Sequence, residues 1–219
     1  MTVRNIRFRQ SVIRTVLGLA AVSGLAMQPV ESAFAKVVEV SMTAVETKLV
    51  IDGEGHTYDA WTFNGQFPGP VIRVQEGDEV VFSLTNPETN GRPHSMDFHA
   101  AETNFLEHYK EVRPGESLQY RFKAKWPGIF AYHCGASPMI QHIARGMMGA
   151  IIVDPKDPKA LPKADREYVL VQSELFKDPD DVDGMFDRKY QHVVFNGSVF
   201  RYDPVHSKAG GDFLDAKPG

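Results

Sequence analysis

The sequence predicts an all-β protein built as an antiparallel Greek-key sandwich, and three observations support this fold class. From Lys36 onward, short segments alternate apolar and polar residues and end at glycine or proline. No stretch shows a long helical pattern with clear capping residues. The 219 residues are 42% hydrophobic and 11% aromatic, which is enough for a packed core and excludes a disordered or collagen-like chain.

The first 35 residues have the features of a secretory signal peptide. Four arginines in the first 14 residues precede an apolar run from Val16 to Met27, and Ala33-Phe34-Ala35 has the small-residue pattern of a cleavage site. The run is too short to cross a bilayer, and no later stretch approaches the needed length. We therefore expect a soluble protein without a membrane span, located in the periplasm or otherwise exported.

The charge of the remaining chain is acidic. Without the signal peptide, 20 Lys and Arg residues stand against 27 Asp and Glu residues. This balance argues against nucleic acid as a partner and is compatible with basic protein partners.

Strand-like alternation is clearest in three segments, Glu79–Leu84, Ser117–Phe122 and Gly149–Val153. In Ser117–Phe122 the apolar residues occupy every second position, so one face can pack on a core while the other meets water. Turn signals separate the predicted strands at Pro68-Gly69-Pro70, Glu76-Gly77-Asp78, Pro114-Gly115-Glu116 and Trp126-Pro127-Gly128.

The composition changes near residue 155 and predicts two domains. The stretch Asp154–Pro158 resembles a linker, so we assign residues 36–160 to a first sandwich domain and 161–219 to the linker and the beginning of a second. Glu167–Leu175 is the predicted first strand of that second unit. Val194-Phe195-Asn196-Gly197 is similar to Thr62-Phe63-Asn64-Gly65, which suggests an internal duplication. We expect residues 161–219 to form an incomplete domain, since half a sandwich cannot bury a complete core; the alternative is an extended arm on a one-domain protein.

Metal-binding residue types gather in two short clusters. His94 and His99 flank Asp97, and His133-Cys134 is followed by His142 and Met147. Cys134 is the chain's single cysteine, so no intrachain disulfide can form. A thiolate, two imidazoles and a weak axial thioether make the trigonal blue-copper set. The matching residues are His94, Cys134, His142 and Met147. A lone cysteine is more often a small buried hydrophobe, but the spacing to His142 and Met147 favours the metal site.

Strand alternation sorts the remaining donors into a second site. Residues an odd number of positions apart point to opposite faces, so His133 faces away from Cys134 and His99 away from His94. Asp97 and His99 share a face. We therefore expect His99 and His133 to hold a second, open metal at which a small oxygen-bearing molecule replaces water. Asp97 is the predicted proton donor, or alternatively a hydrogen-bond partner of a ligating imidazole. The bond between His133 and Cys134 gives an electron a short route between the sites.

These residues resemble the copper-containing nitrite reductases, whose first cupredoxin domain carries similar motifs. The motifs are Pro93-His94-Ser95-Met96-Asp97-Phe98-His99-Ala100-Ala101, Tyr132-His133-Cys134 and His142-Ile143-Ala144-Arg145-Gly146-Met147. The resemblance spans nearly all of the chain after residue 35. It implies type 1 copper at His94, Cys134, His142 and Met147, type 2 copper at His99 and His133, and a catalytic aspartate at Asp97.

The resemblance also implies an activity and partners. Nitrite is reduced by one electron to nitric oxide, the electron passing from type 1 to type 2 copper. The donor is a small periplasmic cytochrome c or cupredoxin, and the family is typically a homotrimer. Its type 2 site takes a further histidine from the second domain of a neighbouring subunit. The sequence ends at Gly219 before such a position, so we expect the 219-residue chain to lack activity by itself.

Two other functions remain open at this point. A two-domain multicopper oxidase reducing oxygen has a similar architecture, but its copper cluster uses His-x-His pairs and this sequence contains none. A non-enzymatic blue-copper electron carrier would use only the type 1 residues and leave His99 and His133 idle. The number of copper ions bound per chain distinguishes the carrier from the enzyme.

Overall fold

The structure, a computed structural model, describes residues 35–102, 104, 109–203, 205, 206 and 214. These residues belong to one compact unit. The predicted signal peptide lies almost wholly outside the described residues, as does His108, which the sequence analysis did not assign to a site. No helix in the described part of the chain is long and apolar enough to cross a membrane.

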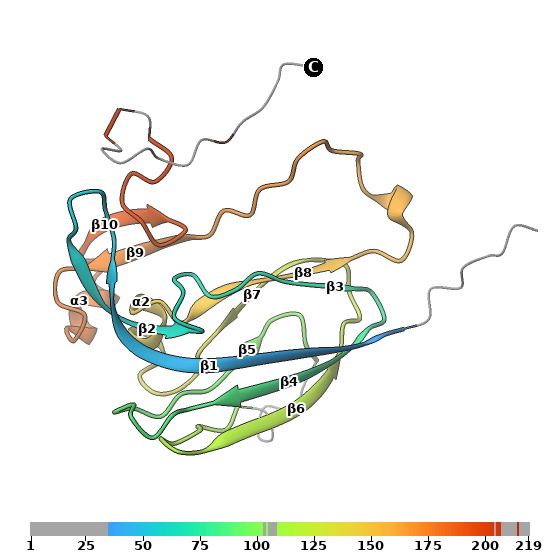
Figure 1. Cartoon of the computed structure of the whole chain (residues 1–219), viewed down its shortest axis with the longest axis horizontal. Helices are drawn as coiled ribbons and strands as arrows, with labels where there is room; N and C mark the ends of the chain where they lie inside the picture. The colour runs from blue at the N-terminus through green and yellow to red at the C-terminus, as the bar shows by residue number, and fades with distance from the viewer. Residues whose placement is uncertain (1–34, 103, 105–108, 204, 207–213, 215–219) are drawn as a thin grey trace, which may run out of the picture. The chain divides into compact units, whose positions relative to one another are not determined.

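Two four-stranded sheets make a sandwich (Figure 1). The first sheet has the order β2-β1-β4-β6, with β1 at Val37–Val50, β2 at Thr57–Phe63, β4 at Glu79–Thr85 and β6 at Ser117–Lys123. The second has the order β3-β8-β7-β5, with β3 at Ile72–Gln75, β8 at Met148–Asp154, β7 at Gly128–His133 and β5 at Asp97–Phe98. The all-β prediction is therefore confirmed, and the three clearest predicted strands correspond to β4, β6 and β8.

The expectation of a purely antiparallel sandwich is wrong for two strand pairs. Strand β1 pairs with β4 in parallel, and β3 pairs with β8 in parallel, while β1/β2, β4/β6, β7/β8 and β5/β7 are antiparallel. Parallel neighbours need a long connection. Here the strands that intervene in sequence supply it, because β1 reaches β4 only after the chain has passed through both β2 and β3.

The core lies between the two sheets and continues into the first candidate site. Phe82 packs its ring 5.0 Å from Phe98, and Tyr132 is fully buried behind Phe63. The same buried cluster contains Met96, Cys134 and Met147. The sulfur-bearing donors are thus held by core packing, in which side chains occupy defined rotamers with little free volume.

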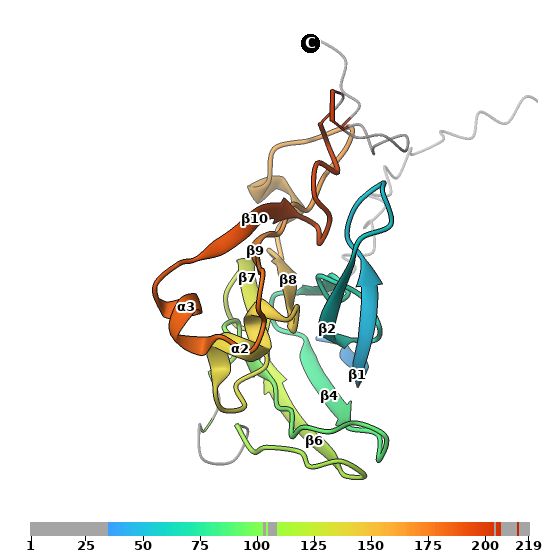
Figure 2. The ribbon, with the colours of Figure 1, turned by 90° about the vertical axis from the view of Figure 1, so that its left-hand side faces the viewer.

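A hairpin and short helices cover one end of the sandwich (Figure 2). The hairpin pairs β9, Gln172–Phe176, with β10, Tyr190–Phe195. Helix α2, Met139–Ala144, contacts both β9 and α3, Val182–Phe186; a single 3₁₀ turn, η1, occupies Pro158–Ala160. A small second core joins Ile51 and Tyr58 of the first sheet's edge to Leu175 and Val194 of the hairpin.

The predicted strand Glu167–Leu175 begins too early. Only Gln172–Phe176 joins a ladder, and residues 166–171 run extended without a partner strand among the described residues. The end of this segment is bound by one asparagine instead. Val171 N donates to Asn196 Oδ1 at 2.9 Å, Asn196 Nδ2 donates to Val169 O at 3.0 Å, and Asn196 N donates to Val171 O at 2.8 Å. An alternating sequence is therefore held here without forming a sheet.

The two similar tetrapeptides adopt the same turn. Asn64 and Asn196 both have positive φ, 57° and 49°, a conformation that asparagine tolerates well. Asn64 Oδ1 accepts from Thr43 N at 2.7 Å and Asn64 N donates to Thr43 O, as Asn196 does with Val171. Gly197 has to be glycine, because a Cβ there would lie 2.0 Å from Phe67 O. The repeated sequence thus has a repeated local structure.

Candidate metal centres

A buried cluster of nitrogen and sulfur donors lies at the end of the core. The donor atoms of His94, Cys134 and His142 all lie within 4.8 Å of one another, and all three side chains are buried. His142 Nδ1 lies 3.3 Å from both Cys134 Sγ and His94 Nδ1. Three donors from three separate segments therefore converge on one small volume.

Backbone hydrogen bonds hold these segments together. His94 forms an isolated two-way bridge with Val112, at 3.0 Å and 2.7 Å. Cys134 follows the end of β7, and its N–H donates to Met147 O at 2.9 Å, while Met147 N donates to His142 O at 3.0 Å. Met147 is fully buried. The loop from Cys134 to Met147 is thus closed on itself and carries three of the four predicted donors.

Ser95 lies beside the sulfur of Cys134 and is held there by hydrogen bonds. Ser95 N donates to Cys134 Sγ at 3.2 Å, and Ser95 Oγ accepts from Gly135 N at 2.8 Å. Burial nevertheless raises the pKa of the Cys134 thiol to about 11. A metal ion that binds here replaces a proton on sulfur, which is the usual coupling between metal binding and pKa.

The two imidazoles of this cluster are neutral. Burial lowers the pKa of His142 to about 3, with help from the nearby charge of Arg92 and Arg145. Burial also lowers the pKa of His94, against the opposing effect of Glu46. Neutral imidazole is the metal-binding form, and the two Nδ1 atoms lie only 3.3 Å apart, so both are placed to bind one metal ion beside the Cys134 sulfur.

Trp61 packs against both histidine rings, and Arg145 packs on Trp61. The Trp61 ring centroid lies 4.6 Å from that of His142 and 5.9 Å from that of His94. Arg145 stacks on Trp61 with its guanidinium carbon 4.4 Å from the ring centroid, and its Nη2 lies 2.5 Å from Asp180 Oδ1. Trp61 is itself buried, and its indole contacts both imidazole rings.

Glu46 contacts the cluster and was not singled out by the sequence analysis. Its Oε1 lies 3.2 Å from His94 Nε2, and Oε1 and Oε2 accept from the backbone N–H groups of Arg92 and Gly91. The strand register of β1 against β2 places Glu46 opposite Trp61. No local motif marks this glutamate, because it lies 48 positions before His94 in the chain.

A second cluster lies on the outward face of the β3-β8-β7-β5 sheet, where β5 pairs with β7. His99 Nε2 and His133 Nε2 are 3.0 Å apart, and Asp97 Oδ2 lies 3.4 Å and 3.6 Å from them. The side chains of His99, Asp97 and His133 are 52%, 18% and 13% exposed. These donors are therefore open to solvent, unlike the buried cluster.

Strand pairing explains why these three side chains meet. Asp97 of β5 lies opposite His133 of β7 in the antiparallel register, and His99 N donates to Ala131 O at 3.0 Å. His133 Nδ1 lies 3.0 Å from Cys134 O, so Nδ1 carries the proton and Nε2 is free to bind a metal. His133 and Cys134 are consecutive, yet one joins the open cluster and the other the buried one.

Tyr109 links the surroundings of the two clusters. Its hydroxyl donates a hydrogen bond to Asp97, and burial together with this bond raises the pKa of the phenol. Its ring packs on Gly135, where a Cβ would lie 2.5 Å from Tyr109 Cε1. Glycine is therefore needed directly after Cys134. The sequence analysis missed Tyr109, which belongs to neither histidine motif.

The other described histidines lie outside both clusters. His56 Nδ1 lies 2.6 Å from Asp52 Oδ2, and His206 Nδ1 lies 2.6 Å from Asp203 Oδ2, both pairs at the exposed surface. His192 is on β10. These three histidines therefore have no part in either donor cluster.

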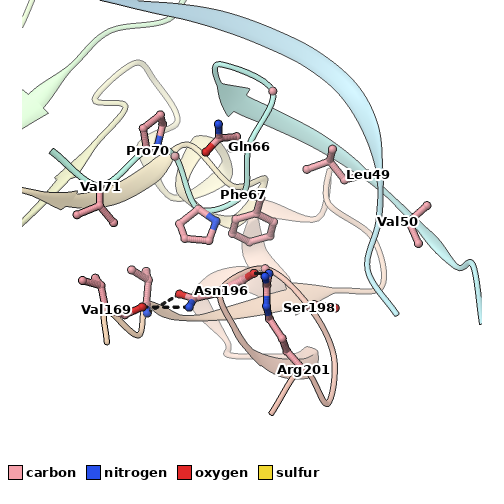
Figure 3. A pocket seen from close by; sticks show the side chains of 15 residues that line it. Leu49, Val50, Gln66, Phe67, Pro70, Val71, Val169, Asn196, Ser198 and Arg201 are labelled. Carbon is pink, nitrogen blue, oxygen red and sulfur yellow. Dashed lines mark hydrogen bonds between the residues drawn. The ribbon is translucent and has the colours of Figure 1, made fainter. Parts of the chain in front are cut away.

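A cavity of about 490 Å³ lies away from both clusters (Figure 3). The turn after β2, including Gln66 and Phe67, forms one wall, and the segments that carry Val169, Asn196 and Arg201 form the other. None of the predicted metal donors lines it. Residues of both similar turns, Gly65, Asn196 and Gly197, line this cavity.

The two donor sets have different chemistry. The buried cluster combines soft sulfur with imidazole, a set that suits a one-electron copper site. The open cluster has imidazole and carboxylate, which suits a metal that exchanges a ligand with solvent. The residues of both clusters therefore fit the copper ions that the sequence resemblance implies.

Similarity to known proteins agrees with this chemistry. The chain is 40% identical over 190 residues to the copper-containing nitrite reductase of Pseudomonas chlororaphis, an alignment that covers 75% of this chain and 52% of that protein. It is 37% identical over 198 residues to the enzyme of the same name from Neisseria gonorrhoeae, covering 83% and 47%. The chain thus spans about half the length of the curated relatives it matches.

A solved structure is more similar still. A copper nitrite reductase from Nitrosomonas europaea, solved at pH 8.5, superposes with a TM-score of 0.82 at 56% identity, covering 84% of this chain and 64% of that one. A family model described as multicopper oxidase matches residues 44–158, more than half of the chain, and includes every predicted metal donor. The chain belongs to the multicopper oxidase family.

Proposed function

We propose that this chain carries the copper sites of a nitrite reductase that forms nitric oxide. The observation that carries the proposal is the pair of chemically different donor sets joined through His133 and Cys134. One set is buried and contains sulfur, and the other is open and contains a carboxylate. Electron carriers need only the first set. A second, solvent-facing donor set, which begins at the adjacent residue His133, favours an enzyme in which electrons from the buried site reduce a substrate at the open site.

Each residue has a proposed role in this function. His94, Cys134 and His142, with Met147 as a weak fourth donor, hold type 1 copper, while His99 and His133 hold type 2 copper. Copper supplies one-electron redox chemistry at the first site and an exchangeable coordination position at the second. The shielding by Trp61 keeps water from the buried imidazoles.

Asp97 has the proposed role of moving a proton. Reduction of nitrite takes one electron and two protons and yields nitric oxide and one water. The Asp97 carboxylate lies 3.4 Å and 3.6 Å from the two imidazole nitrogens of the open cluster, so it is placed to pass a proton to a molecule bound there. The hydrogen bond from Tyr109 fixes its orientation.

The partners and location are part of the same proposal. The electron donor is a small cytochrome c or cupredoxin, the protein is exported to the periplasm, and it serves denitrification. Assembly is a homotrimer in which a neighbouring copy completes the open site. Two features support this: the described open cluster has only two imidazoles, and Ile129, on the same strand face as His133, is 73% exposed.

We also propose that residues 36–160 and 161–219 belong to duplicated cupredoxin units. The support is the matching hydrogen-bond pattern at Asn64 and Asn196, each of which accepts from and donates to a strand-like segment that precedes it. The predicted boundary near residue 160 falls close to η1, just after β8 ends.

A three-way assay tests the function. A catalytically competent, copper-loaded assembly, in which a neighbouring copy completes the open site, is reduced anaerobically with an artificial one-electron donor. Nitrite or oxygen is then added while nitric oxide and oxygen are followed by electrodes. The proposal predicts nitric oxide from nitrite. Oxygen consumption without nitric oxide would identify an oxidase, and reversible bleaching of the copper band with neither product would identify an electron carrier. His99→Ala should abolish the activity, and His56→Ala, at an exposed histidine far from both clusters, serves as the control.

A further inference from the structure

We propose that Glu46 is a positioning residue for His94 and, through that imidazole, sets the copper affinity and the reduction potential of the buried site. This inference rests on the copper site proposed above and goes beyond it, because Glu46 belongs to neither donor cluster. It comes from β1, whereas His94 lies in the loop between β4 and β5.

The two ring nitrogens of His94 have different partners. Nδ1 faces the donor cluster, 3.3 Å from His142 Nδ1, and Nε2 lies 3.2 Å from Glu46 Oε1. A carboxylate can only accept, so the proton of the neutral imidazole sits on Nε2 and the lone pair on Nδ1. Glu46 thereby selects the tautomer that can bind a metal within the cluster. Carboxylate–histidine–metal arrangements of this kind orient the ring and raise its basicity.

The Glu46 carboxylate is itself held in place. Oε1 also accepts from Arg92 N at 2.9 Å, and Oε2 accepts from Gly91 N at 3.0 Å. Glu46 N donates to Asn90 Oδ1 at 3.4 Å, and Asn90 Nδ2 donates to Ala44 O at 2.9 Å. Together with the contact to His94, these hydrogen bonds tie β1 to the loop that leads into His94, which limits the positions that the imidazole can take.

The negative charge of Glu46 should affect the reduction potential of the copper as well as the position of the His94 ring. Cu(II) carries one more positive charge than Cu(I), so a carboxylate hydrogen-bonded to a ligand favours the oxidised state. Arg92 and Arg145 act on His142 in the opposite sense. Loss of the Glu46 charge should therefore raise the reduction potential. A tenfold loss of affinity confined to Cu(II) corresponds to about 59 mV for a one-electron couple.

The decisive variant is Glu46→Gln. A glutamine keeps its oxygen towards His94 and Arg92 only if its NH₂ group faces the N–H of Gly91, so the variant loses the charge and one backbone contact. We expect copper affinity to fall about 10- to 100-fold in competition with a chelator. We also expect the potential to rise and the visible thiolate–copper band to shift.

Glu39→Gln is the matched control. It makes the same change of charge on an exposed residue of the same strand, seven positions away, or roughly 23 Å at the strand rise of about 3.3 Å per residue. Affinity and potential should stay at the wild-type values. Glu46→Asp keeps the charge but shortens the reach to Nε2, so copper affinity should fall while the potential moves less than in Glu46→Gln.

The outcomes separate this inference from the proposed function. If both Glu46 variants lower only the unfolding temperature and leave copper affinity, band and potential unchanged, Glu46 merely clamps the loop and the inference is overturned. Should Glu46→Gln fail to fold, the affinity of Glu46→Asp decides the matter. A catalytically competent wild-type assembly that binds copper at both sites without reducing nitrite refutes the function, while a shifted potential in Glu46→Gln would still support the role of Glu46.

Discussion

Replacing Asp97 by asparagine removes the proposed proton donor with almost no change in side-chain volume. The asparagine oxygen can still accept the hydrogen bond from Tyr109, and neither imidazole nitrogen of the open cluster is altered. The copper sites should therefore survive. What is lost is a group that can deliver a proton to an oxygen bound beside His99 and His133.

The size of the fall in turnover distinguishes proton delivery by Asp97 from a role in orienting an imidazole. Loss of a general acid or base lowers turnover about 10²- to 10⁴-fold, or about 2.7 to 5.4 kcal/mol in activation free energy at about 1.36 kcal/mol per tenfold. If Asp97 only oriented an imidazole through a hydrogen bond, asparagine would replace that bond in part. The cost would then be near the roughly 0.5–1.5 kcal/mol typical of one hydrogen bond, or about 2- to 13-fold.

The assay measures kcat for nitric oxide formation at saturating nitrite in a catalytically competent, copper-loaded assembly. Copper content and the visible band are measured on the same sample, so that loss of metal is not taken for loss of chemistry. A fall of at least a hundredfold with both coppers retained supports proton delivery by Asp97. A rate within tenfold of the wild type at neutral pH would refute it.

Three further predictions concern single side chains. His99→Ala should remove copper from the open cluster and leave the visible band intact, because the donors of the buried cluster are separate residues. Copper analysis together with optical spectroscopy checks this, and loss of the band would show that the two sites depend on each other. Tyr109→Phe should lower kcat by up to about 10- to 160-fold with unchanged copper content, since a hydrogen bond to a charged group contributes about 1.5–3 kcal/mol. An unchanged kcat would limit Tyr109 to packing on Gly135. Asn196→Ala removes three side-chain hydrogen bonds, to Val171, Val169 and Tyr202, and should lower the free energy of unfolding by about 2–4 kcal/mol. Denaturant titration measures this, and a loss below about 0.5 kcal/mol would contradict the structural importance of the repeated turn.

The sequence is most informative where the physical rule is local. Strand alternation has a period of two, so it separates His133 from Cys134 and His94 from His99, and the folded chain brings together the same two groups. The loop from Cys134 to Met147 is short, so its donors are close in the chain as well as in space.

Features that depend on distant segments are not accessible in this way. Glu46 reaches His94 only through the pairing of β1 with its neighbours, and Tyr109 reaches Asp97 from outside both motifs. The parallel pairing of β1 with β4 likewise depends on topology. Glu167–Leu175 has the alternation of a strand, but alternation does not reveal whether a partner strand is present.

Tertiary packing also changes the pKa of residues that the sequence predicts as ligands. Burial of its ring is the main cause that lowers the pKa of His142 to about 3. Imidazole normally titrates near a pKa of about 6.5. The residue type alone therefore predicts a possible ligand, whereas its burial determines that the ring is neutral and available at any physiological pH.

The central claim is that Cys134 lies in a copper site made by this chain's own residues. The most direct test is optical and electron paramagnetic resonance spectroscopy of the purified protein after loading with Cu(II), compared with Cys134→Ser. The account predicts an intense visible thiolate-to-copper absorption in the wild type that is absent from the serine variant, with about one such copper per chain. A folded wild-type protein that binds Cu(II) without this absorption would contradict the account.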